Sequence, residues 1–237
     1  MDLPAAALVC PLYGRPFRTA AFVEGCARGA TGPQTVYLVC TADRPADIAA
    51  AEATAAEVIV LDGPREPGDW ARKINTAYRA TTEPILVLLG DDVTPRPGWH
   101  NEVANAYAQG FGVIGTQDLG NRRVLAGIHS THPAVARWYA DAHGTVDGPG
   151  NVVSEEYHHN CTYNELVGTA KARGMWTFCN AAVLEHNHPN WGKAETDWVY
   201  SLGREGFDKD RWTLEKRSRL WASLSPLPRT EIAAGSR

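Results

Sequence analysis

Two adjacent carboxylates that end an apolar run are the residues of this sequence best suited to chemistry. Residues 85–89 are all aliphatic, and one glycine leads from them into Asp91 and Asp92. Such a run predicts a buried strand of a parallel sheet, and ligands of open α/β sheets gather beyond the carboxyl ends of strands. Carboxylate oxygens bind hard divalent cations, which in turn hold phosphates. The pair therefore predicts a metal-diphosphate site, although Asp is also common in ordinary strand-to-loop turns.

Two histidines far along the chain supply further candidate metal ligands. His186 and His188 are separated by one residue and followed by Pro189. Positions two apart in a strand lie on the same face, and imidazole is a good ligand for ions of the Mn²⁺ type. We expect either histidine to complete a metal site begun by Asp92, with Mn²⁺ or Mg²⁺ as the cofactor. A structural role for each histidine is the alternative.

The elements that must position these residues alternate regularly over the first hundred residues. Strand patterns cover 5–10, 35–40, 57–62 and 85–89, and helix patterns cover 16–27, 46–56 and 69–79. Strands alternating with helices of about ten residues indicate βαβ units and a parallel sheet with right-handed crossovers. The predicted fold class is therefore α/β, a Rossmann-like domain with a mostly parallel central sheet flanked by helices.

The second half of the sequence is less regular. It predicts helices at 99–108, 133–141 and 161–173, and strands at 112–116, 124–128 and 176–185. Glycines and a proline at 143–150 predict a loop, either a substrate lid or a surface excursion. The tail, 206–237, predicts a helix with a basic face that carries two tryptophans. A solvated face is the simplest role for it, and a polyanion surface or an oligomer contact are alternatives.

Composition restricts the function classes. The 237 residues fit one large α/β domain, and a net charge of −4 gives no overall attraction to nucleic acid or membrane. No apolar run predicts a membrane span. Five cysteines without a Cys-x-x-Cys pair favour reduced thiols and a cytoplasmic location over disulfides or zinc. The absence of P-loop and Gly-x-Gly-x-x-Gly motifs disfavours ATPase and dehydrogenase functions.

Together these motifs resemble the GT-A glycosyltransferases, specifically the family-2-like group that uses nucleotide sugars. The resemblance covers residues 5–200 and is carried by the motifs at 11–16, 41–43, 70–75 and 90–92 and by the late histidines. It implies a GT-A domain over 1–205, with a nucleotide-binding half at 1–100 and an acceptor half at 101–205. Stand-alone transferases of bacteriophages of actinobacteria look similar.

The resemblance also implies roles for particular residues. Asp92, His186 and His188 would hold the metal. The nucleotide sugar would be bound by Pro11, Tyr13, Arg15, Asp43, Arg72, Asn75 and Asp91. These roles suit the chemistry, because a nucleoside diphosphate leaves easily only when a cation neutralises its developing charge. The implied reaction is inverting transfer of a hexose from a nucleotide diphosphate sugar to an acceptor hydroxyl.

An inverting transferase also needs a base, and here the sequence departs from the family pattern. The family's acidic pair falls on Thr162 and Tyr163, so Glu156 and Glu165 are the candidate bases. Flat rings could form an acceptor platform, although core packing is the alternative for each. These rings belong to Trp99, His129, His132, Trp138 and Trp191.

The acceptor and two competing functions stay open. The acceptor could be a glycan, a small metabolite, a lipid carrier or hydroxymethylated bases of phage DNA. Arg122, Arg123 and the basic tail favour DNA by neutralising phosphates, whereas the acidic net charge disfavours it. A nucleotidyltransferase and a non-catalytic nucleotide-sugar or glycan-binding protein are the alternatives, the second motivated by Tyr163 where an acid is expected. The oligomeric state is not predicted.

Overall fold

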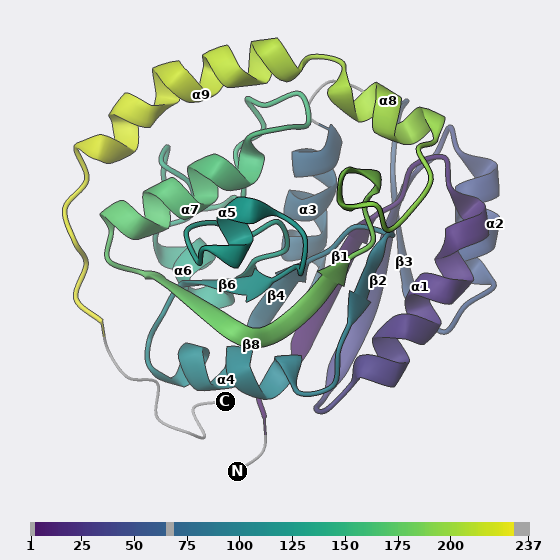
Figure 1. Ribbon diagram of the computed structural model, residues 1–237, viewed down its shortest axis with the longest axis horizontal. Helices are drawn as coiled ribbons and strands as arrows, with labels where there is room; N and C mark the ends of the chain where they lie inside the picture. The colour runs from purple at the N-terminus through teal and green to yellow at the C-terminus, as the bar shows by residue number, and fades with distance from the viewer. Residues whose placement is uncertain (1–2, 65–68, 230–237) are drawn as a thin grey trace.

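A single mixed sheet organises the protein, with helices on both of its faces (Figure 1). The computed structural model describes residues 3–64 and 69–229. Across this part of the chain the eight strands follow the order β3-β2-β1-β4-β7-β6-β8-β5. The Rossmann-like α/β class expected from the sequence is confirmed.

The first half contains the predicted alternation. Its strands are β1 (Ala6–Pro11), β2 (Gln34–Thr41), β3 (Glu57–Leu61) and β4 (Ile85–Leu88), and its helices are α1 (Pro16–Gly29), α2 (Pro45–Glu52) and α3 (Asp69–Ala80). All four strands are parallel to their neighbours within this half. Every residue of β1 and β4 is buried, which explains their uninterrupted apolar sequences.

The second half adds an antiparallel insertion to the sheet. Its elements are β5 (Val93–Pro95), α4 (Trp99–Ala108), β6 (Val113–Gln117), α5 (Arg122–Leu125), β7 (Ala134–Ala136), α6 (Arg137–Ala142), α7 (Thr162–Ala172) and β8 (Trp176–His186). Strand β7 is antiparallel to both β4 and β6, and β5 is antiparallel to the end of β8. Because β5 pairs with the last residues of β8, this pairing brings the late histidines beside the Asp91-Asp92 turn.

Two predictions for this half were wrong. The strand expected at 124–128 is helix α5 and a turn, because the side chain of Asn121 caps the helix by accepting a hydrogen bond from Arg123 N. The helix expected to open at Pro133 begins only at Arg137. Residues 134–136 are instead fully buried in β7, where pairing with two strands overrides the local pattern.

The core lies in two layers, one on each face of the sheet. Phe22 of α1 and Trp99 of α4 belong to the first layer. Ile74 of α3 and Tyr139 of α6 belong to the second. Both layers include side chains from β1 and β4, so the two strands that lead to the candidate site are held rigidly on both sides.

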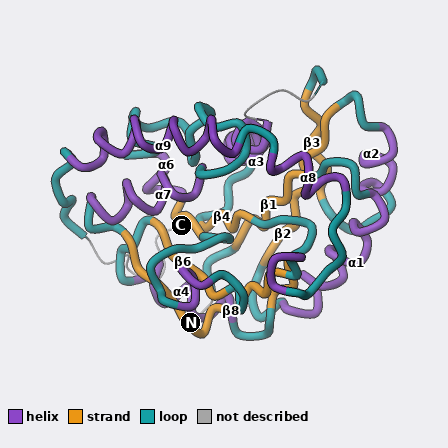
Figure 2. The backbone as a smooth tube through the Cα atoms, turned by 45° about the horizontal axis from the view of Figure 1, so that its top comes forward, coloured by secondary structure: helices purple, strands orange, loops and turns teal. Residues whose placement is uncertain are grey.

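The C-terminal segment packs near the carboxyl ends of the strands and then against α7. It consists of a 3-10 turn η1 (Pro189–Trp191), α8 (Trp198–Arg204) and α9 (Phe207–Ala222). Helix α9 lies along α7 in both views (Figures 1 and 2). None of the residues of α8 is buried. Residues 230–237 of the predicted tail lie outside the described residues. Among the helices that are described, none has the length and apolar character needed to cross a membrane.

Candidate active site

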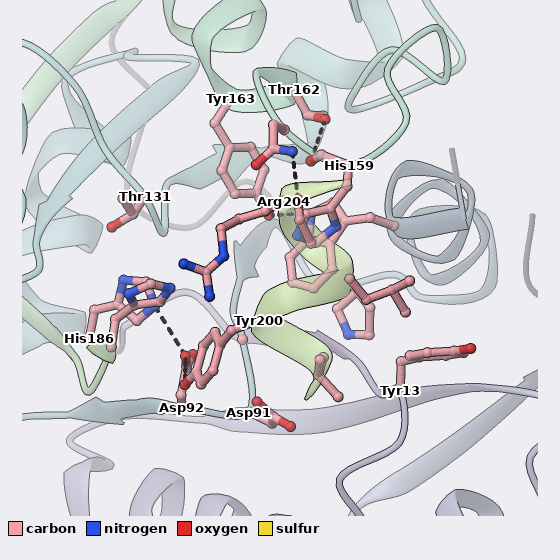
Figure 3. Close-up of a pocket in the computed structure, with 18 of the residues that line it drawn as sticks. Tyr13, Asp91, Asp92, Thr131, His159, Thr162, Tyr163, His186, Tyr200 and Arg204 are labelled. Atoms are coloured by element: carbon pink, nitrogen blue, oxygen red, sulfur yellow. Dashed lines mark hydrogen bonds and ion pairs between the residues drawn. The ribbon is translucent and has the colours of Figure 1, made fainter. Parts of the chain in front are cut away.

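A cavity of about 450 Å³ opens beyond the carboxyl ends of β1 and β4 (Figure 3). Side chains from distant parts of the chain line it, including residues within 11–15, 90–92, 129–132, 159–164, 186–190 and 196–207. The parallel strands deliver Tyr13, Asp91 and Asp92, and β8 delivers His186. The cavity therefore lies where ligands of α/β sheets bind.

The two carboxylates have different surroundings. Asp92 accepts a 2.8 Å hydrogen bond from the Tyr200 hydroxyl, and its Oδ2 lies 3.3 Å from His186 Nε2. Burial alone would raise the pKa of Asp92, but the contacts with His186 and Tyr200 hold it well below its usual range. Burial raises the pKa of Asp91 to about 6, although Arg15 at 3.0 Å opposes that rise. Asp92 is therefore the carboxylate that stays charged for a cation.

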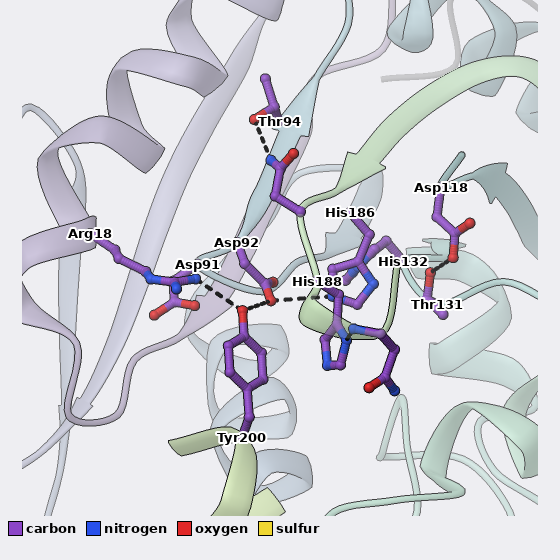
Figure 4. A network of polar contacts seen from close by, with 12 residues as sticks. Arg18, Asp91, Asp92, Thr94, Asp118, Thr131, His132, His186, His188 and Tyr200 are labelled. Carbon is purple, nitrogen blue, oxygen red and sulfur yellow. Dashed lines mark hydrogen bonds and ion pairs between the residues drawn. The ribbon is translucent and has the colours of Figure 1, made fainter. Parts of the chain in front are cut away.

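Three imidazoles surround this carboxylate. The rings of His132 and His188 lie 4.6 Å and 4.9 Å from that of His186, and Figure 4 shows all three beside Asp92. Burial lowers the pKa of His132 to about 3 and that of His188 to about 4. Both rings are therefore neutral at pH 7, which is the form that binds metal.

The donor atoms of Asp92 and the neighbouring histidines suit a divalent cation. As the side chains stand, no three His, Cys, Asp or Glu residues of the described chain converge closely enough to hold an ion. However, His132 Nε2 and His186 Nδ1 are buried without hydrogen-bond partners there. The Tyr200 hydroxyl donates to Asp92 Oδ2, so an ion that binds this oxygen would replace the hydroxyl. Neutral imidazoles and an ionised carboxylate are the donors that such an ion needs.

The opposite wall of the cavity is aromatic and cationic. Arg15 is 6% exposed and donates two hydrogen bonds of 2.8 Å to Asp197, besides its bond to Asp91. Trp198 lies edge-on to Tyr13, with 5.8 Å between the ring centroids. It also covers Gly14, where an added Cβ would lie 2.4 Å from the indole. These contacts hold α8 against the loop that follows β1.

Comparison with known proteins relates this geometry to a fold. No protein-family model and no curated protein matches the sequence. A glucosyl-3-phosphoglycerate synthase from Mycobacterium tuberculosis, solved with Mn²⁺, UDP and phosphoglyceric acid, aligns with a TM-score of 0.60 at 12% identity, over 91% of this chain and 78% of that one. A mannosyltransferase from Pyrobaculum calidifontis, solved with GDP-Man and Mn²⁺, aligns with a TM-score of 0.60 at 16% identity. That alignment covers 91% of this chain but 65% of the longer neighbour.

The chain has the GT-A fold. A third structure, the same synthase with Mn²⁺, UDP-glucose and glycerol 3-phosphate, aligns over 97% of this chain and 88% of that one, with a TM-score of 0.58 at 13% identity. The fold predicted from the motifs is thus confirmed over nearly the whole chain.

The structure brings most of the predicted GT-A site residues into one cavity. Pro11, Tyr13, Arg15, Asp91, Asp92, His186 and His188 all line it. Asp43, Arg72 and Asn75 are not among the described lining residues. Asp43 is exposed, and Arg72 pairs with Asp69 at 2.7 Å. The Asn75 amide is buried and holds the backbone at Val152 and Val153.

The two predicted bases lie outside the described cavity lining as well. Glu156 is exposed, and Glu165 is 2% exposed beneath α9. Both oxygens of Glu165 accept hydrogen bonds from Arg217, and Oε2 also accepts one from Tyr157. The carboxylates that do line the described cavity are Asp69, Asp91 and Asp92.

The expected acceptor platform is also only partly present. Trp99 is fully buried and stacks on His100 in the core, so it cannot contact a ligand. Trp138 and Trp191 are absent from the described lining, whereas His129 and His132 belong to it.

Sequence reasoning missed several charged or polar residues of the site, among them Lys73, Asp197 and Tyr200. Lys73 is 1% exposed, donates to the Leu12 carbonyl at 2.7 Å and pairs with Asp69 at 3.2 Å. It lies inside the 70–75 motif, so the motif itself was a usable signal. Tyr200 and Asp197 had no such signal, because only the folded chain brings α8 to Asp92 and Arg15.

One wall of the cavity depends on the last helix. The buried carboxylate of Asp210 in α9 accepts hydrogen bonds from the backbone N–H groups of His158, His159 and Asn160, at 2.6, 3.0 and 2.6 Å. Asp210 is 1% exposed. The segment that carries His159 and Asn160 into the cavity is therefore fixed from α9.

Proposed function

We propose that this GT-A protein is a glycosyltransferase that moves a hexose from a nucleotide diphosphate sugar to an acceptor hydroxyl, with Mn²⁺ or Mg²⁺ as cofactor. The observation that carries the proposal is the charged Asp92 beside neutral imidazoles, at the carboxyl end of β4 and inside the cavity. The structural neighbours solved with UDP or GDP-Man and Mn²⁺ support it.

The residues of the two cavity walls would then have different roles in binding the metal and the nucleotide sugar. Asp92, His186 and His188 would hold the ion, which supplies positive charge against the diphosphate leaving group. Arg15, fixed between Asp91 and Asp197, would keep Asp91 oriented toward the ribose or the sugar. Tyr13 offers an aromatic face on the nucleoside side. Glu165 receives no role in proton transfer, because Arg217 and Tyr157 engage its oxygens.

The acceptor side of the cavity favours a small anionic hydroxyl compound. Arg204 projects into the cavity (Figure 3), and it has no hydrogen bond or ion pair to another described residue. A guanidinium in this state suits a carboxylate or phosphate group of the acceptor. Phosphoglyceric acid and glycerol 3-phosphate are bound in the structural neighbours, which supports this acceptor class.

Hydroxymethylated DNA is the second candidate acceptor. Arg123 and Arg211 line a separate surface groove of about 600 Å³, which shares Asn164 with the main cavity. The DNA phosphates could bind along these cations, but the carboxylates of Asp208 and Glu215 line the same groove and would repel the phosphates. We therefore rank the small anionic acceptor first.

The first experiment measures ligand-induced stabilisation. Thermal melts are recorded with UDP, GDP and their glucose and mannose derivatives, with and without Mn²⁺, for wild type, Asp92→Asn and the exposed control Glu24→Gln. A ligand at a hundredfold excess over its dissociation constant should raise the melting temperature by about 5 to 10 °C. We expect this shift to require Mn²⁺, to survive in Glu24→Gln and to disappear in Asp92→Asn.

The nucleotide that shifts the melt is then used in turnover assays. Release of the free nucleoside diphosphate in the presence of phosphoglycerate, glycerol 3-phosphate or hydroxymethylated DNA would identify the acceptor. Binding without turnover would favour a nucleotide-sugar-binding protein, and release of pyrophosphate from a nucleoside triphosphate would favour a nucleotidyltransferase. No Mn²⁺-dependent shift with any nucleotide would refute the glycosyltransferase proposal.

A further inference from the structure

A third histidine converges on the carboxylate that the proposed function assigns to the metal. His132 lies two residues before β7, and its ring meets that of His186 edge-on. An added Cβ at Gly90 would lie 2.8 Å from Asp92 Oδ1 and 3.8 Å from His132 Cε1. His132 and Asp92 therefore approach each other over the bare backbone of Gly90, and Figure 4 shows both beside His186.

The hydrogen bond of His132 Nδ1 sets the tautomer of the neutral ring, and therefore whether Nε2 has a lone pair. Nδ1 lies 3.3 Å from the carbonyl oxygen of Leu88, which can only accept, so Nδ1 carries the proton. Nε2 then holds a lone pair, and it is buried without a hydrogen-bond partner among the described residues. A ring that donates one N–H to a backbone carbonyl and presents its other nitrogen is arranged as metal-binding histidines are.

His188 has the opposite arrangement. Its Nδ1 accepts a 3.1 Å hydrogen bond from the backbone N–H of Asn190, so the proton of the neutral ring lies on Nε2. To offer a lone pair from Nε2, His188 would have to give up this bond. His132 needs no such change.

The backbone around His132 is also rigid. Its carbonyl accepts a 2.6 Å hydrogen bond from the Thr116 hydroxyl, and the next carbonyl, that of Pro133, accepts one of 3.0 Å from Leu88 N. These bonds tie the residue to β6 and β4, so the imidazole is held in place before any ligand arrives.

We propose that His132, in place of His188, is a metal ligand together with Asp92 and His186, and that this set selects Mn²⁺ or another transition ion over Mg²⁺. The inference rests on the proposed function, since it concerns the same metal site. Two imidazoles beside a carboxylate suit transition ions, whereas Mg²⁺ prefers oxygen ligands and keeps several waters.

Electron paramagnetic resonance of Mn²⁺ tests the proposal without an activity assay. The full chain is titrated with Mn²⁺, alone and with UDP or GDP, while the signal of free Mn²⁺ is recorded. We expect His132→Gln to weaken Mn²⁺ binding about tenfold or more, while the matched cavity variant His129→Gln changes it less than about twofold. The Mg²⁺ concentration that displaces half of the bound Mn²⁺ should fall in the same proportion in His132→Gln alone.

A second measurement detects the nitrogen ligands of bound Mn²⁺ directly. Pulsed spectra of Mn²⁺ bound to the wild type should contain couplings to at least two imidazole nitrogens, and His132→Gln should lose one of them. Metal-free thermal melts of each variant check that it folds.

The possible failures are distinguishable. Coupling to a single nitrogen in the wild type, or unchanged Mn²⁺ affinity in His132→Gln, would overturn the role of His132 and leave the glycosyltransferase proposal intact. Equal weakening in both His→Gln variants would also overturn it, because the loss would then reflect damage to the cavity wall. A wild type that binds no Mn²⁺ with any nucleotide would overturn both proposals.

Discussion

His129 is a buried imidazole on the acceptor side whose charge state bears on stability. Burial, together with Arg123 and Lys171, lowers its pKa to about 4, and Asp118 opposes this change. The unfolded chain has an ordinary histidine pKa of about 6.5. Between these two values the unfolded state binds more protons than the folded state, so the contribution of His129 to stability is present above pH 6.5 and is lost as the pH falls toward 4.

We therefore expect His129→Gln to flatten the acid side of the stability profile. Wild type should lose roughly 2 kcal/mol more than His129→Gln between pH 7 and pH 5. Urea unfolding at several pH values measures the difference. The pKa of Asp91 is raised to about 6, so Asp91 increases the free energy of unfolding as the pH falls. This effect is the same in both proteins and does not change the difference between them. Parallel profiles for the two proteins would contradict the buried, neutral state of His129.

Single residues were predictable from the sequence where a strand delivers them directly. Asp91, Asp92 and His186 each follow or end an apolar run, so their place at the sheet edge could be inferred. Tyr200 could not be inferred, because its hydrogen bond to Asp92 spans 108 positions and no residue of α8 is buried in the core. His132 was recognised as a ring near the acceptor, while its convergence on Asp92 depends on the pairing of β7.

At the scale of elements, one ion pair joins α9 to α7. Arg217 binds both oxygens of Glu165, and the two side chains are 13% and 2% exposed. Removing one partner of a buried pair leaves an uncompensated charge. We expect Arg217→Met to lower the free energy of unfolding by about 3 kcal/mol, measured by urea unfolding.

The neighbouring Arg219 is exposed on the same helix and provides the control, since Arg219→Met should change stability little. Adding Glu165→Gln to Arg217→Met should recover part of the loss, because no buried charge then remains. Equal and small effects of the two arginine substitutions would show that the pair does not anchor α9.

Elements with strong periodicity were predictable, and elements created by their neighbours were not. Each of the parallel strands β1 to β4 contains an apolar run, and they were found from that property. Strand β7 consists of three residues that acquire their conformation from pairing with β4 and β6. Helix α5 is equally short and depends on the Asn121 cap. Such short segments carry too little pattern to outweigh their tertiary surroundings.

At the scale of the molecule, α9 packs against α7 and the cavity wall, and we propose that it belongs to the domain although the sequence predicts a separate tail for 206–237. It supplies Asp210 to the cavity wall and Arg217 to the buried Glu165. We expect a chain ended at residue 205 to lose its cooperative thermal transition and its Mn²⁺-nucleotide shift. A chain ended at residue 229 should retain both. Circular dichroism melts of the two truncations, with and without ligand, make the comparison. A 1–205 chain that is stable and binds the ligand would show that the domain does not need α9.

The three hydrogen bonds that Asp210 accepts also impose an order in time. During synthesis the parallel strands β1 to β4 leave the ribosome before α9 and can pair while α9 is still being made. Residues 158–160 emerge later, but the carboxylate that fixes them arrives only with α9. A nascent chain can therefore hold Asp91 and Asp92 in place before residues 158–160 are fixed, and the wall of the cavity is complete only once α9 has been made.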